Sequence, residues 1–160
     1  AGRLWIGTMG FGAPKGAGTL YTVVPDGMVE IKLEKVTISN GIVWSANKKY
    51  MYYNDTPTGR VARYRYDEKT GEILFDGVAV TLPPGSGAPD GMTIDSNDNL
   101  WVAQWGGFGV YCYNPYTGEL LGSSGSQCGL LCIRRQGYGY ALHYNGTGRT
   151  FGTTTGRISP

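Results

Sequence analysis

The sequence predicts an all-β protein made of small repeated sheets, the pattern of a β-propeller. Three observations carry this prediction. No window places apolar residues at the spacing of an amphipathic helix between a cap and a stop. Short runs rich in aromatic and β-branched residues are bounded by turn residues. These runs recur at nearly 50 residues, because Trp5, Tyr52 and Trp101 are 47 and 49 residues apart.

Each repeat follows one order of elements. A strand with the Trp or Tyr leads to a second strand, and a turn containing Gly reverses the chain, since Gly accepts positive φ without steric cost. A third strand and a fourth element follow the first two of these turns. The expected elements are residues 3–8, 19–23, 29–33, 39–44, 50–53, 61–64, 78–82, 89–95, 100–103 and 110–113. Two complete repeats and part of a third are too few to close a propeller. An ordinary β-sandwich with chance similarity is the alternative.

The composition excludes several classes of protein. With 41% hydrophobic residues in 160, the chain has enough apolar side chains for a core. A net charge of +2 gives no basic footprint for nucleic acid, and no apolar run is long enough to cross a membrane. The three cysteines lack the paired spacing of a disulfide scaffold. Unpaired Cys112 favours a cytoplasmic location, although the chain opens at a strand and its N-terminus is expected to be incomplete.

The charge is divided unevenly along the chain. Residues 1–121 hold all 12 acidic and 10 of the basic residues, a formal charge of −2. Residues 122–160 contain no Asp or Glu but have four Arg and nine Gly. Such a break marks a change of module. We therefore expect a partial propeller at 1–121 and an aberrant tail at 122–160.

Asn40 and Asp90 are the candidate metal ligands. They lie 50 residues apart, each precedes Gly, and each begins the strand expected nearest the propeller axis. Equivalent residues of successive blades point toward the same channel, so an amide oxygen and a carboxylate converge there. Two hard oxygen ligands suit Ca²⁺, Mg²⁺, Mn²⁺ or Zn²⁺. The alternative is that Asn-Gly and Asp-Gly are only turn dipeptides.

Six ordered segments carry a resemblance to a known family. They read GRLWIGTM from Gly2, GTLY from Gly18, ISNGIVWS from Ile38, MYYNDT from Met51, PDGMTID from Pro89 and LWVA from Leu100. Together they resemble the regucalcin/gluconolactonase family, which includes luciferin-regenerating proteins, over residues 1 to about 121. The resemblance implies a six-bladed propeller with one divalent metal ion in its channel, which hydrolyses sugar lactones and related esters.

The resemblance also implies roles for individual residues. Asn40 matches a metal-binding Asn, and Asp90 matches a metal-binding Asp that also transfers the proton. The family's third ligand, a Glu, and its Arg-x-Asn substrate clamp would lie upstream of Ala1. An acidic substrate contact is also missing, because residues 10–19 contain no Asp or Glu. Substrate-binding residues are therefore unknown, and catalysis by this chain alone is in doubt.

The tail is compatible with a shifted reading frame. Codons can be chosen that encode residues 135–152 and that, read one base later, encode GKDMDTLYITTAREGLS instead. The LYIT in this shifted sequence repeats the pattern of residues 4–8. We therefore expect a frameshift between about residues 122 and 129, and the alternative is a divergent tail rich in Gly, Arg and Tyr. The nucleotide sequence across this junction distinguishes the two.

These observations predict metal-dependent hydrolysis of sugar lactones by a protein of which this chain is a fragment. The expected partner is a small sugar lactone or related ester, with neither nucleic acid nor membrane. No Ser or Cys stands in a nucleophile-elbow pattern, which argues against a triad hydrolase. Two alternatives remain: a non-catalytic calcium-binding or scaffold propeller, and a truncated inactive product.

Overall fold

The computed structural model describes residues 2–125, 128–135 and 138–145, and the fold in these residues is all-β. A single 3-10 turn, η1 (Thr56–Thr58), interrupts the strands of the described residues. None of their helices is long and apolar enough to span a bilayer. The strands are β1 (Leu4–Gly7), β2 (Gly18–Val23), β3 (Val29–Val36), β4 (Ser39–Trp44), β5 (Tyr50–Asp55), β6 (Arg60–Tyr66), β7 (Ile73–Thr81), β8 (Ala88–Ile94), β9 (Leu100–Trp105), β10 (Gly109–Tyr113), β11 (Leu120–Gly125), β12 (Cys128–Arg135) and β13 (Tyr138–Asn145).

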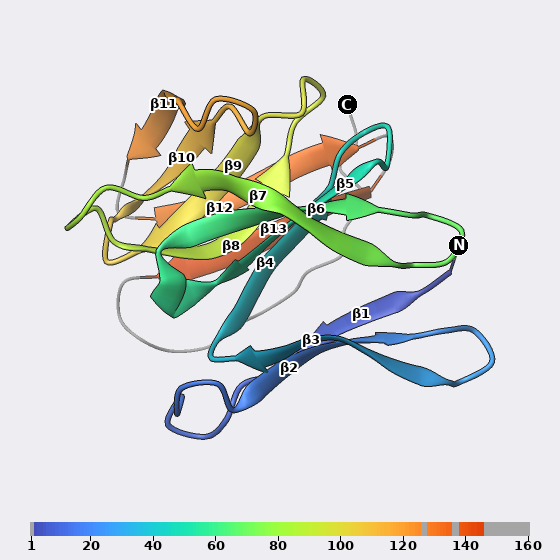
Figure 1. Ribbon diagram of the computed structural model, residues 1–160. Coiled ribbons are helices and arrows are strands. Elements are labelled where there is room, and N and C mark those ends of the chain that lie inside the picture. The colour runs from blue at the N-terminus through green and yellow to red at the C-terminus, as the bar shows by residue number, and fades with distance from the viewer. Residues whose placement is uncertain (1, 126–127, 136–137, 146–160) are drawn as a thin grey trace.

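These strands form successive antiparallel sheets (Figure 1). The first sheet has the order β1-β2-β3, the middle sheet β4-β5-β6-β7 and the third sheet β11-β10-β9-β8. Strands β12 and β13 pair only with each other. In Figure 1 the middle sheet lies between the first sheet and the third. The repeated sheets confirm the all-β architecture that the sequence predicts.

The burial pattern follows from this stacking of sheets. Side chains of a strand alternate between its two faces, so a strand with one covered face alternates in burial. Strand β2 does so, with Leu20 and Thr22 buried. Strand β5 is buried along both faces because neighbouring sheets cover it on each side: Met51 and Tyr53 face the first sheet, and Tyr52 faces the third.

Two apolar seams hold the sheets together. Between the first and middle sheets lie four buried residues, Leu20, Val36, Met51 and Tyr53. The rings of Trp5, Trp44 and Tyr66 pack edge to face beside them, with centroids 5.5 to 6.1 Å apart. The larger seam joins the middle and third sheets and contains Tyr52, Val61, Ala79, Val80, Leu82, Met92, Leu100, Val102 and Tyr113.

The strands up to β10 agree with the sequence prediction, whereas β11, β12 and β13 were not predicted, and the sheets are offset by one strand from the sequence repeat. The fourth element of each repeat does not complete its own sheet, because β4 opens the middle sheet and β8 opens the third. The first sheet consequently has three strands, and the outer edge of β1 is unpaired within the described residues. Sequence reasoning missed β11, whose Leu-Leu-Gly-Ser-Ser-Gly sequence lacks β-branched and aromatic residues.

Candidate functional site

Asn40 and Asp90 lie on β4 and β8, the edge strands at which the middle and third sheets meet. The structure brings their side chains into contact, with Asn40 Nδ2 2.5 Å from Asp90 Oδ1. Both residues are partly buried. The equivalence inferred from the 50-residue spacing therefore corresponds to a real juxtaposition, while the metal-binding and catalytic roles of the two residues remain predictions.

Equivalent irregularities in the two strands explain why both side chains face the same seam. The register of β4 against β5 shifts between residues 39 and 42, and that of β8 against β9 shifts between residues 89 and 92. An irregularity of this kind redirects a side chain relative to the regular pleat. The Asn-Gly and Asp-Gly pairs thus lie inside strands. The alternative that they are merely hairpin turns is wrong.

A second set of contacts fixes the two side chains in place. Thr56 of η1 accepts a hydrogen bond from Asn40 Nδ2 at 3.1 Å and donates one to the Pro89 carbonyl at 2.9 Å. Asn54 of β5 donates to the backbone carbonyl of Asp90 at 2.8 Å. Sequence reasoning missed Asn54 and Thr56. The available signal in the sequence was the polar run Asn54-Asp55-Thr56, which directly follows the apolar residues of β5.

Gly41 allows the two strands to approach each other. A Cβ atom at this position would lie 2.7 Å from the Asp90 carbonyl oxygen and 2.7 Å from Met92 Cγ. It would also lie 2.8 Å from Asn54 Nδ2. These separations are shorter than real Cβ contacts, so the close packing around Asp90 requires a residue without a side chain.

Tyr53 anchors the start of β4 beside the site. Its phenol donates a hydrogen bond to Ser39 Oγ at 2.6 Å, one residue before Asn40. Burial, with a further contribution from the charge of Asp55, raises the pKa of Tyr53 to about 12. The phenol therefore remains a neutral donor at physiological pH and holds Ser39 without adding charge.

The residue types at the seam suit part of a site for a hard divalent cation, although in this structure Asn40 turns its Nδ2 rather than its oxygen toward Asp90. An amide oxygen from Asn40 and a carboxylate from Asp90 are ligands of the kind that Ca²⁺ and Mg²⁺ prefer. Asn54, whose Nδ2 contacts the backbone of Asp90, has a buried Oδ1 that lacks a hydrogen-bond partner among the described residues. No group of three or more His, Cys, Asp or Glu side chains gathers in the part of the chain that the structure describes. Any such ion would therefore take its other ligands from amide oxygens, water or residues outside this part.

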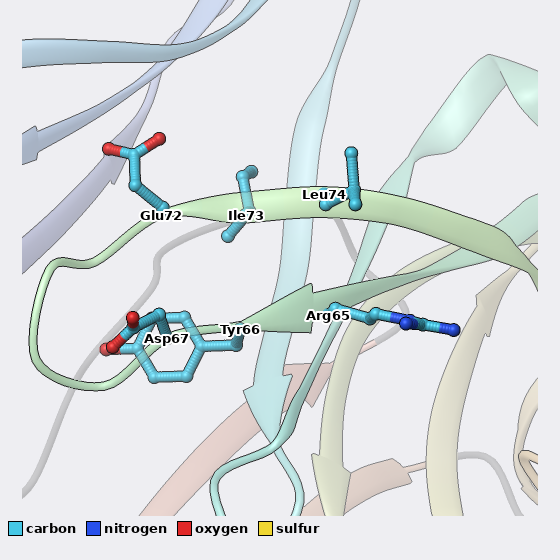
Figure 2. Close-up of a pocket in the computed structure, with 6 residues that line it drawn as sticks. All are labelled: Arg65, Tyr66, Asp67, Glu72, Ile73 and Leu74. Carbon is cyan, nitrogen blue, oxygen red and sulfur yellow. The ribbon is translucent and has the colours of Figure 1, made fainter.

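A hollow of about 420 Å³ lies away from the seam that holds Asn40 and Asp90 (Figure 2). It is formed where β6 ends and β7 begins, whereas Thr56 and Asn40 lie near the opposite end of β6. Its charged side chains have local partners: Glu72 binds Lys32 at 2.7 Å, and Asp67 accepts the backbone N–H of Lys69 at 2.8 Å. Because its side chains do not converge on one point in Figure 2, this hollow has no constellation suited to chemistry.

Comparison with known families matches residues 1–126 to the SMP-30/Gluconolactonase/LRE-like region. The chain belongs to this family. The match spans the three sheets described above and includes Asn40 and Asp90. It confirms the family resemblance and, with the observed sheets, the propeller class of the fold.

Individual members of the SMP-30/gluconolactonase family agree with this assignment. The "Putative sugar lactone lactonase YvrE" of Bacillus subtilis is 39% identical over 123 residues, which is 76% of this chain and 42% of that protein. Human regucalcin is 38% identical over 126 residues, again 76% of this chain and 42% of the relative. The chain thus spans about two fifths of the length of the curated relatives it matches.

Solved structures place the fold in the same family. A luciferin-regenerating enzyme superposes with a TM-score of 0.76 at 28% identity, covering 95% of this chain and 56% of that one. A regucalcin from Agrobacterium tumefaciens, described as a calcium-binding protein, gives a TM-score of 0.75 at 27% identity. That superposition covers 88% of this chain and 49% of the regucalcin chain.

Proposed function

We propose that this chain carries part of the active site of a metal-dependent hydrolase of sugar lactones. Membership of the gluconolactonase-type family supports lactone hydrolysis at the level of the family. The observation that carries the proposal to this chain is the contact of Asn40 with Asp90 between adjacent sheets. The ion would be Ca²⁺, Zn²⁺, Mg²⁺ or Mn²⁺, bound through the Asn40 amide oxygen and the Asp90 carboxylate.

In this proposal, Asp90 has two tasks. When bound, the ion polarises the lactone carbonyl and makes a bound water more acidic. The Asp90 carboxylate accepts a proton from the attacking water and returns it to the ring oxygen as the acyl C–O bond breaks, which leaves an open-chain hydroxy acid. Asn54 fixes the backbone of Asp90, and Thr56 fixes the amide of Asn40, so both groups are oriented before substrate arrives.

Ring opening of gluconolactone by an intact, in-frame parent of this chain tests this proposal, measured after chelation and after adding back each of the four metal ions. We expect metal-dependent turnover that Asp90→Asn lowers by about 100-fold or more, because a positioned proton acceptor contributes that much. Asp26→Asn is the matched control, since Asp26 lies in an exposed turn where it accepts the backbone N–H of Met28. Turnover that needs no metal, or that survives Asp90→Asn, would contradict the proposal.

A non-catalytic calcium-binding propeller is the second candidate. The oxygen donors at the seam favour it, as does the structural similarity to a regucalcin described as calcium-binding. Calorimetric titration with Ca²⁺ separates the two candidates. Binding that requires Asp90, without any lactone turnover, would favour the second.

A cytoplasmic location remains part of the proposal. Cys112 is buried and has no disulfide partner among the described residues, a state that reducing compartments preserve. Burial raises the pKa of its thiol, which keeps the group protonated and unreactive.

A further inference from the structure

A cleft of about 1050 Å³ opens beside the candidate site. Its lining comes from three segments: the loop between β1 and β2, the end of β3 with the residue that follows it, and the end of β5 with η1. The lining residues are Ala13, Lys15, Gly16, Lys35, Thr37, Asp55, Pro57 and Thr58. The third segment links the cleft to the site, because Thr56 contacts Asn40 while its neighbours Asp55 and Pro57 line the cleft. A ligand held at Asn40 and Asp90 can therefore extend into the cleft.

The charged side chains of the cleft favour an anion. Lys15 and Lys35 are cationic and exposed, and neither forms an ion pair within the described residues. Asp55 is the one anionic side chain among the described lining residues. Its two carboxylate oxygens accept the backbone N–H groups of Thr37 at 3.0 Å and Ile38 at 2.8 Å. These bonds hold the carboxylate against the backbone and leave the two ammonium groups available.

The backbone that carries the two lysines is ordered rather than loose. Lys35 has φ of +58°, a left-handed conformation that is uncommon for a residue other than Gly. It lies where the pairing of β2 with β3 becomes irregular, so its side chain leaves the regular alternation of the strand. The loop that carries Lys15 is fixed by hydrogen bonds from Gly16 N to Thr37 Oγ1 at 3.1 Å and from Ala17 N to the Pro14 carbonyl at 3.2 Å.

We propose that this cleft binds a negatively charged group at the far end of the substrate, so that the chain prefers lactones bearing a carboxylate or a phosphate over neutral sugar lactones. The identification of the ligand as a lactone rests on the proposed function; the anion site itself rests on Lys15 and Lys35. The segments that carry the two lysines lie side by side, since a Cβ on Gly16 would be 3.6 Å from Lys35 Cβ, and two ammonium groups from one side of the cleft give an anion charge-assisted hydrogen bonds that a neutral hydroxyl cannot match.

Binding of three sugars that differ only at the sixth carbon tests this proposal without any turnover. Glucose carries a hydroxyl group there, glucuronate a carboxylate and glucose 6-phosphate a phosphate. Calorimetry on the full chain after metal chelation should show both charged sugars, or one of them, binding about tenfold or more tightly than glucose. The stronger of the two identifies the anionic group that the cleft accepts.

Matched variants locate the effect. Lys15→Met with Lys35→Met should abolish the preference, while Lys49→Met, the same loss of charge at an exposed residue of the β4–β5 turn, should preserve it. Circular dichroism confirms that each variant keeps its strands. No detectable binding of either charged sugar, equal binding of glucose, or loss of the preference in Lys49→Met would overturn the proposal. Because lactone turnover is not measured, failure here is separate from failure of the Asp90→Asn experiment.

Discussion

Gly41 limits how far the site between β4 and β8 can vary. Its Cα faces the backbone of Asp90 at a distance that leaves no room for a methyl group. We expect Gly41→Ala to lower the free energy of unfolding by about 1–3 kcal/mol, the usual cost of overpacking. Urea unfolding monitored by tryptophan fluorescence measures this change.

Gly122→Ala is the control for that variant. A Cβ at Gly122 meets nothing within 4 Å, and the residue is exposed near the end of the third sheet. Alanine there should leave stability unchanged or raise it slightly, because it reduces the freedom of the unfolded chain. If both substitutions lowered the free energy of unfolding equally, the close approach of the Asp90 backbone to Gly41 could not be the reason that position 41 needs glycine.

Among individual residues, the sequence could predict that Asn40 and Asp90 lie together, but not which other residues contact them. Asn40 and Asp90 are recognisable because a repeat of 50 residues places them in equivalent positions. Asn54 and Thr56 belong to the same chain segment as Asp55, yet their contacts depend on how two sheets meet. Lys15 and Lys35 come from different loops, and no spacing rule indicates that they share a cleft.

Among the strand connections, the turn between β8 and β9 depends on one carboxylate. Asp95 accepts the backbone N–H groups of Asn97 and Asn99, both at 2.9 Å, and the indole N–H of Trp101 at 3.1 Å. Burial acts to raise the pKa of Asp95, but the hydrogen bonds from Asn99 and Trp101 together outweigh it and lower the pKa below its ordinary value of 3.8. The ionised form therefore stabilises the hairpin.

The stabilisation from Asp95 should depend on pH. A depressed pKa in the folded state gives stability that is fully present above the unfolded pKa, near 3.8, and is lost as the pH falls through the lower folded value. Asp95→Asn should cost about 1.5–3 kcal/mol at pH 7, the scale of a hydrogen bond to a charged group. The difference between variant and wild type should shrink below pH 4 in urea titrations. A difference that stays constant down to pH 3 would rule out the charge as its source.

Strands were predictable where residue type and turn chemistry agree, as in β5 and β9. Prediction failed for β11, since its Gly and Ser residues are held by pairing with β10 rather than by their own preference. The offset between repeat and sheet was also hidden, because local sequence does not specify which sheet an edge strand joins. That choice depends on the apolar seams on either side of β5.

For the molecule as a whole, we propose that the family-like sequence ends near residue 121, although β11 continues the third sheet to Gly125, and that the tail is read out of frame. The family match ends at residue 126, and β12 and β13 pair only with each other. We expect a chain ending at Gly125, which retains all of β11, to unfold within about 2 °C of the 160-residue chain. Thermal unfolding monitored by circular dichroism measures the difference.

A chain ending at Gly87 is the control for the truncation. It lacks the third sheet, so Tyr52 and Val61 lose the seam that buries them, and its cooperative transition should disappear. Comparable loss in the chain ending at Gly125 would show that the tail belongs to the fold. The gene's nucleotides across residues 122–129 test the frameshift directly, since codons that forbid the shifted reading would end that idea.

The location of Asn40 and Asp90 on different sheets has a mechanical consequence. An ion bound by both residues would cross-link the middle and third sheets at their shared edge, and that link exists only while the two sheets remain together. The affinity for the ion and the resistance of the two sheets to separation would then both depend on the same equilibrium, that between packed and separated sheets. A substitution in the apolar seam around Tyr52 would weaken ion binding without touching a ligand, and a bound ion would slow the separation of the sheets without touching the core.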